Sequence, residues 1–235
     1  INSASISRDR KTIVSGSDDK TVKLWRRDGT PITTISDHTE KVNSVVFSSD
    51  DRIIASGSDD KTVRFWTIEG EPMNIISNAN GDKTNILQHT DKVKRVVFSP
   101  DGKYIAATSE DETIKIWKTD GTEINTMDSG GDLLSFSHDS KMLAFASSRT
   151  RGIKIYLLNK DISFKPVQLV TQRRVWDISF NPDSQSIAVA HEDDVSILSL
   201  DIDELLQEAC GLGRNHLKHN PNMKDKRHLC DGVGD

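Results

Sequence analysis

A short segment recurs along this chain, and its repetition limits the folds that the chain can form. The segment 53–66, IIASGSDDKTVRFW, has two apolar runs rich in β-branched and aromatic residues around the polar turn 58–61. This pattern predicts a β-hairpin. Similar segments end at Trp25, Trp117, Tyr156 and about Leu198. Because a hairpin cannot bury both of its faces alone, the copies are expected to stack on one another.

A second marker precedes each hairpin at a nearly constant distance. It is an apolar residue followed by Ser or Asn, with Asp two or three positions further on, and it occurs at 6–7, 47–48, 98–99, 136–137 and 180–181. The distance between successive markers varies more than the distance from marker to hairpin. Insertions are therefore expected in the loops that connect the units.

Each unit is predicted to form four strands, named a to d along the chain. In the second unit they are 42–48, 52–58, 62–67 and 71–77, and the third unit repeats the pattern with Pro-Asp-Gly and Asp-Gly turns. The polar segment 78–85, NANGDKTN, is expected to be a mobile surface loop. The fifth unit has no clear fourth strand.

A period near 40, four strands per repeat and Trp at the end of the third strand resemble the WD-repeat β-propeller family. The resemblance implies an all-β fold, a β-propeller of four-stranded antiparallel blades. Five blade repeats are present, which indicates a partial propeller, and a five-bladed ring is the alternative. The blades are expected within residues 1–200. Residues 201–235 are expected to form a short C-terminal helical tail, partly disordered, because Ile202, Leu205 and Leu206 have helical spacing.

The family resemblance also implies a buried hydrogen-bonded chain in each blade, formed by His, Ser or Thr, Asp and Trp. Burial of an indole N–H and a carboxylate requires such partners. The third unit has Ala107 where the second has Ser56, so Thr108 or Ser109 must substitute or the chain is broken. The expected structural residues are His38, Ser56, Asp60, Trp66, His89, Asp111, Trp117, Ser15, Asp19 and Trp25.

The composition and the motifs argue against several function classes. The net charge of −5, from 31 basic and 36 acidic residues, does not favour nucleic-acid binding. No apolar run is long enough to span a membrane. Two cysteines are too few for a disulfide framework, and a cytoplasmic location is expected. No nucleophile or nucleotide-binding motif occurs, so no catalytic residue and no cofactor are expected.

Two groups of charged or ligating residues have ordinary explanations. Cys210, His216, His219, His228 and Cys230 do not have the spacing of a known zinc site, so no metal is expected. A basic residue precedes the aromatic end of strand c by two positions at Lys23, Arg64, Lys115 and Lys154. A basic row is one interpretation, and separate outward charges are the favoured one.

Trp176 differs from the other tryptophans because it enters strand a, where other units have Asn2, Asn43 and Lys94. It either packs inward with Ile178 and Phe180 or forms an exposed hot spot with Arg174. The loops between strands d and a, together with those between b and c, are expected to form a protein-binding face. Its predicted members are Lys41, Asn43, Asp59, Lys92, Lys94, Glu110, Arg174 and Trp176.

The expected function is that of a non-catalytic protein–protein interaction scaffold or sensor module. The tail sequences DIDELLQEAC, LKHNPN and RHLCDG resemble those of bacterial multidomain WD-repeat signalling proteins. That resemblance implies upstream domains or further blades on the same polypeptide, with protein partners of unknown identity. The alternatives are a structural subunit of a large assembly and an enzyme with its site in the central channel. The enzyme would need converging charges, for which Arg95 and Asp177 alone are too few.

Overall fold

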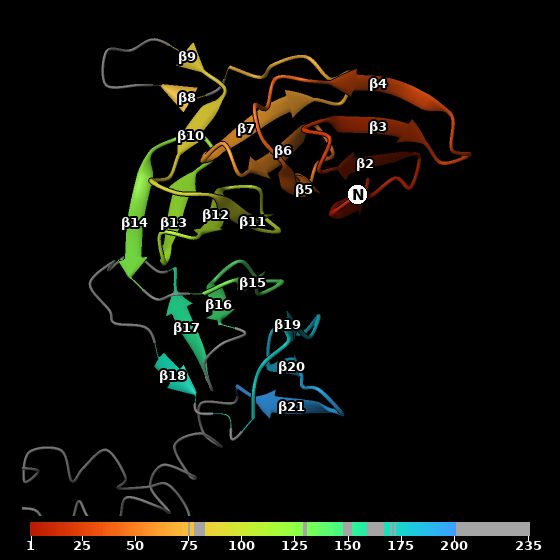
Figure 1. Ribbon diagram of the computed structural model, residues 1–235. Helices are drawn as coiled ribbons and strands as arrows, with labels where there is room; N and C mark the ends of the chain where they lie inside the picture. The colour runs from red at the N-terminus through yellow and green to blue at the C-terminus, as the bar shows by residue number, and fades with distance from the viewer. Residues whose placement is uncertain are drawn as a thin grey trace, which may run out of the picture.

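A computed structural model describes residues 1–74, 76–77, 83–128, 131–147, 152–158, 167–169, 171 and 173–200. Within these ranges the chain forms strands and turns only, arranged as successive antiparallel sheets along an arc (Figure 1). The all-β fold of four-stranded blades is therefore confirmed. The predicted helical tail lies outside the described residues.

The strands follow one another in simple up-and-down order. The first sheet contains β1 (Ser3–Ile6), β2 (Thr12–Gly16), β3 (Val22–Arg26) and β4 (Pro31–Ile35). The second contains β5 (Val42–Phe47), β6 (Ile53–Ser58), β7 (Thr62–Thr67) and β10 (Ile86–Gln88), with β8 (Ile76–Ser77) and β9 (Lys83–Thr84) forming a separate ribbon.

The remaining sheets repeat this order. The third contains β11 (Val93–Phe98), β12 (Tyr104–Ser109), β13 (Thr113–Lys118) and β14 (Glu123–Asp128). The fourth contains β15 (Leu133–Phe136), β16 (Met142–Ala146), β17 (Ile153–Leu157) and β18 (Val167–Leu169). The fifth has three strands in the described part of the chain, β19 (Asp177–Phe180), β20 (Ser186–Ala190) and β21 (Val195–Ser199).

The outer strand of the second sheet was predicted only in part. Of residues 71–77, which were expected to pair along β7, residues 71–73 do so: Pro72 forms an isolated bridge with Trp66, and Met73 N–H donates to Phe65 O at 2.9 Å. The chain then leaves for the β8–β9 ribbon. The chain returns as β10, which pairs Leu87 with Val63. The insertion thus divides the outer edge between two segments. Lys83–Thr84 of the predicted loop form strand β9, and residues 78–82 lie outside the described part.

Each pair of neighbouring sheets encloses its own apolar core. Between the first and second sheets, Val14 and Leu24 pack with Phe47, Ile54 and Trp66. Equivalent cores separate the second from the third sheet, the third from the fourth and the fourth from the fifth. The sheets approach closely at Gly16, where an added Cβ would lie 2.6 Å from Val42 Cγ1. Stacking therefore buries both faces of every internal sheet.

The fifth sheet leaves its far face uncovered. Val195 and Ile197 have exposed fractions of 64% and 66%. The strand registers place them where the second sheet has Val63 and Phe65, both fully buried against the third sheet. The fifth sheet thus has the apolar pattern of an internal blade without a neighbour in the described part of the chain, as a partial propeller requires.

Candidate interaction site

The second sheet contains a complete buried hydrogen-bonded chain. Trp66 Nε1 donates to Ser56 Oγ at 2.8 Å, and His38 Nε2 lies 2.7 Å from the same hydroxyl. His38 Nδ1 lies 2.7 Å from Asp60 Oδ2, and the Thr62 hydroxyl donates to Asp60 Oδ1. Burial alone would raise the pKa of Asp60, but the hydrogen bonds from His38 and Thr62 outweigh it and hold that pKa well below its usual range. These contacts fit a structural interpretation.

The third sheet has the same residues except for the serine, and its chain is broken. Ala107 provides no hydroxyl, and His89 Nε2 and Thr108 Oγ1 are buried without a partner. Ser109 does not substitute, because its hydroxyl donates to Asp91 O at 3.0 Å. Burial lowers the pKa of His89 although Asp111, 3.4 Å from Nδ1, opposes this effect. His89 therefore lies in an incompletely satisfied site where burial disfavours its charged form.

The other sheets keep only parts of this arrangement. In the first, Trp25 Nε1 donates to Ser15 Oγ at 2.9 Å, and hydrogen bonds from Thr21 lower the pKa of Asp19 to about 2. In the fourth sheet, the Tyr156 hydroxyl is buried without a partner. The hydrogen-bonded chain is thus complete in the second sheet and weakens in the third and fourth.

The loop ends of the second and third sheets bring together six of the predicted binding residues. Asn43 Nδ2 donates to Asp59 Oδ1 at 2.7 Å and to Val93 O at 2.8 Å, which joins the two sheets. Lys92 and Lys94 lie 3.6 and 3.8 Å from the Glu110 carboxylate, and Lys41 lies 3.4 Å from Asp18. The group is a polar surface of paired side chains, in which Lys41 pairs with the first sheet and the others pair with one another.

The two remaining predicted residues lie at the same end of the fifth sheet. Trp176 is 58% exposed, so the interpretation in which it packs inward is wrong. Arg174 is exposed, and its carbonyl oxygen lies 2.8 Å from His191 Nδ1. Among the described contacts, none joins these two residues to the six on the second and third sheets. The predicted face therefore has two separate parts.

Hydrogen bonds connect the first strands of neighbouring sheets. Ser3 Oγ accepts from Val45 N–H, and Ser44 Oγ accepts from Val96 N–H. These hydroxyls satisfy backbone donors at the edge of each sheet, where no further strand pairs. Arg95 occupies the position of Ser44 in the third sheet, and its Nη1 lies 3.3 Å from Asp177 Oδ1. The two channel charges considered for catalysis therefore pair with each other.

Three of the four basic residues considered as a row make separate contacts. Lys23 lies 3.3 Å from Asp19, Arg64 donates to the Thr62 hydroxyl at 3.3 Å, and Lys115 lies 3.7 Å from Glu123. These contacts agree with the interpretation of separate charges. Within the described residues, no helix is long and apolar enough to cross a membrane, and no group of three ligating side chains could hold a metal.

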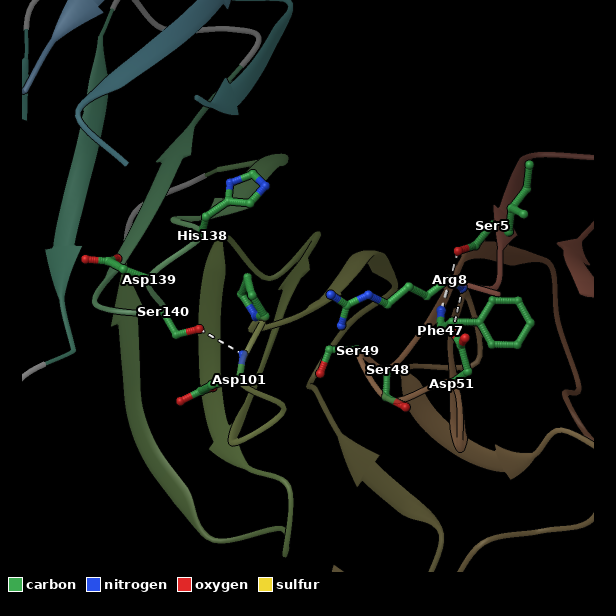
Figure 2. A pocket seen from close by; sticks show the side chains of 12 residues that line it. Ser5, Arg8, Phe47, Ser48, Ser49, Asp51, Asp101, His138, Asp139 and Ser140 are labelled. Atoms are coloured by element: carbon green, nitrogen blue, oxygen red, sulfur yellow. Dashed lines mark hydrogen bonds between the residues drawn. The ribbon is translucent and has the colours of Figure 1, made fainter. Parts of the chain in front are cut away.

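A cavity lies at the ends of the sheets opposite the predicted binding loops, and the sequence did not predict it. It has a volume of about 630 Å³ and lies where the turns between the first and second strands of four sheets come together (Figure 2). Arg8, Ser49, Pro100 and His138 line it. Each stands between the Ser and the Asp of a turn marker. The marker was a signal for these turns, but the middle residue differs among the four turns that line the cavity.

Comparison with known proteins identifies the repeats. Residues 1–26, 29–67 and 81–118 match the family described as WD domain, G-beta repeat. The second segment spans β4 to β7, so a sequence repeat joins the outer strand of one sheet to the first three strands of the next. These WD40 repeats indicate a protein–protein interaction scaffold.

A curated relative aligns with about half of the chain. The chain is 26% identical over 130 residues to "DDB1- and CUL4-associated factor 13" of Dictyostelium discoideum. The aligned region covers 52% of this chain and 29% of that protein. The chain therefore spans less than a third of the length of this relative.

Proposed function

We propose that this chain is a non-catalytic interaction module of a larger cytoplasmic signalling protein, acting as scaffold or sensor. Further blades or domains on the same polypeptide are part of the proposal. The observation that carries it is the exposure of Trp176 on an otherwise polar loop end. An exposed Trp beside Arg is the composition of a binding hot spot, because both residues contribute large contact areas when desolvated.

The contacts around Trp176 support the proposal that its side chain is held exposed for binding. Its backbone N–H donates to Ala190 O at 2.8 Å, which holds the main chain to β20 while the indole faces solvent. Arg173 Nη1 pairs with Asp194 Oδ2 at 2.6 Å and fixes the neighbouring loop. A preorganised anchor of this kind loses little conformational entropy on binding.

The partner is proposed to be a protein. The name of the Dictyostelium relative describes a protein associated with DDB1 and CUL4, so these two are the first partners to test. The six paired residues on the second and third sheets, from Lys41 to Glu110, are proposed as a more polar contact region of the same face.

Affinity capture with the full chain and two matched variants tests the proposal. Trp176→Ala is expected to lose captured proteins that wild type retains. Ile32→Ala removes an exposed apolar side chain from β4 and is expected to lose none. Equal capture by all three proteins, with unchanged circular dichroism, would contradict the proposal. A structural-subunit role would give permanent co-purification that survives Trp176→Ala.

A further inference from the structure

The cavity opposite the proposed binding face has a rigid wall built from repeated turns. In four turns a Ser hydroxyl donates to an Asp carboxylate two residues later, at 2.6 to 2.7 Å. The same carboxylate accepts the backbone N–H of the residue two positions after it. Such Asx-type bonds fix the turn backbone and leave the middle side chain free to point outward.

Neighbouring turns are also joined to one another. Asp51 Oδ1 accepts from Arg8 N–H at 2.7 Å, and Asp51 Oδ2 accepts from Asp9 N–H at 3.1 Å. Ser140 Oγ accepts from Asp101 N–H at 2.9 Å in the same way. Gly102 stands at the equivalent position of the third turn and offers no side chain for this link. The turns therefore form a rim with one interruption between the second and third sheets.

The middle residues of four successive turns line the cavity inside this rim. Figure 2 shows the Arg8 side chain extending across the opening, with Ser49 below its guanidinium group and His138 on the opposite wall. Phe47 and Pro100 add apolar surface. Residues separated by about 40 positions in sequence thus form one site.

The acidic groups of the rim are already satisfied. Both oxygens of Asp51 accept backbone N–H groups. Asp101 pairs with Lys103 at 3.3 Å and Asp139 pairs with Lys141 at 3.6 Å. In Figure 2 the carboxylates of Asp101 and Asp139 point away from the Arg8 guanidinium.

Arg8, by contrast, has no carboxylate within ion-pair distance among the described residues, and its side chain makes no hydrogen bond there. Ser49 and His138 likewise make no side-chain hydrogen bond in the described part of the chain. The groups left available to a ligand are a guanidinium, a hydroxyl and an imidazole. A guanidinium fork matches the two oxygens of a carboxylate or phosphate group.

We propose that this cavity binds an oxyanion carried on a peptide, with Arg8 as the anchor and Ser49 and His138 as secondary contacts. The source of the anion is an acidic side chain or a phosphorylated one. The peptide origin rests on the proposed interaction function, whereas binding of the anion itself does not. The site is separate from Trp176, so one protein could engage two partners or two segments of one partner.

Titration with three pentapeptides tests the proposal. The probes are Gly-Gly-X-Gly-Gly, with glutamate, phosphoserine or serine at X, and binding is followed by amide chemical shifts. Either charged peptide is expected to shift the turn resonances of residues 8, 49 and 138, and the serine peptide is not. A response to only one of the charged peptides identifies the source of the anion. Equal responses to all three, or no response to any, would overturn the proposal.

Matched variants remove the same charge at different places. Arg8→Ala is expected to weaken binding of the charged peptide at least tenfold, while Arg27→Ala, an exposed arginine outside the cavity, is expected to leave it unchanged. Because the Arg8 backbone makes the bond to Asp51, the alanine variant should stay folded. Equal loss in both variants would show nonspecific charge attraction and contradict the site. Capture through Trp176 should not change in Arg8→Ala, which separates this proposal from the preceding one.

Discussion

Arg95 Nη1 of β11 and Asp177 Oδ1 of β19 lie 3.3 Å apart, although the fourth sheet stands between their strands in the chain. Arg95 takes the place that Ser3 and Ser44 hold in the first two sheets, where each serine bonds only to the next sheet. The ion pair therefore connects sheets that do not stack on one another.

This ion pair is expected to contribute little to stability. Its side chains are 38% and 59% exposed, and exposed pairs contribute roughly 0.2–1 kcal/mol. A double-mutant cycle with Arg95→Ala and Asp177→Ala, followed by urea unfolding, should give a coupling energy in that range that falls with added salt. A coupling energy above about 2 kcal/mol would show that the pair is a principal link across the arc.

Ser56→Ala is expected to lower the free energy of unfolding by about 1–3 kcal/mol, since it leaves the buried Trp66 Nε1–H and His38 Nε2 without their hydrogen bonds to Ser56. Chemical denaturation measures the change. Ser17→Ala is a suitable control, because the Ser17 hydroxyl hydrogen-bonds only the exposed residue Asp19. Equal effects of the two substitutions would contradict a structural role for the hydrogen-bonded chain.

Ala107→Ser is expected to raise the free energy of unfolding by about 1 kcal/mol. The new hydroxyl would stand in the register of Ser56, where His89 Nε2 lacks a partner. Ala55→Ser places a hydroxyl at another buried site of the core and is expected to destabilise. If Ala107→Ser also destabilised, the third sheet would have adapted its packing to alanine.

Acid is expected to remove the stability that ionised Asp60 provides. Its folded-state pKa is depressed, so this stability is present above the unfolded pKa near ~4 and is lost as pH falls further. The stability difference between wild type and Asp60→Asn should shrink as pH is lowered from 6 toward 2 in denaturation experiments. A difference that stays constant over this range would show that the charge of Asp60 is unimportant. Asp37→Asn, at an exposed position, is the control.

Val63 and Val195 occupy the same register position in the second and fifth sheets, so the effects of Val63→Ala and Val195→Ala can be compared directly. Val63 is fully buried, so Val63→Ala is expected to lower the free energy of unfolding by about 1–3 kcal/mol. Val195 is mostly exposed, so Val195→Ala is expected to lower it by less than about 0.5 kcal/mol. Thermal unfolding of the isolated chain measures both. A large cost for Val195→Ala would mean that the face of the fifth sheet is covered.

The sequence predicted local features of the fold well. Strand 62–67 has the observed bounds because turn residues and the apolar pattern are encoded within the hairpin. The outer strand of the second sheet was predicted only in part. Its second segment, β10, was missed because it follows a long insertion and its pairing with β7 is not local.

The sites could be predicted only in part. The hydrogen-bonded chain of His38, Ser56, Asp60 and Trp66 follows from a repeated pattern, and the break at Ala107 was foreseen as one of two outcomes. The exposure of Trp176 depends on how the last sheet packs, so the sequence left it open. The cavity of Arg8 and His138 was missed because its residues occupy the variable position of each turn, where no shared chemistry marks them.

The role of Trp176 in binding is tested most directly by the affinity of a captured partner for wild type and for Trp176→Ala, measured by calorimetry with Ile32→Ala as control. Trp176→Ala is expected to raise the dissociation constant by about 30-fold or more, because loss of a hot-spot side chain weakens binding by ~2 kcal/mol. Ile32→Ala should leave it unchanged. An unchanged dissociation constant for folded Trp176→Ala would contradict the claim that this end of the fifth sheet is the binding site.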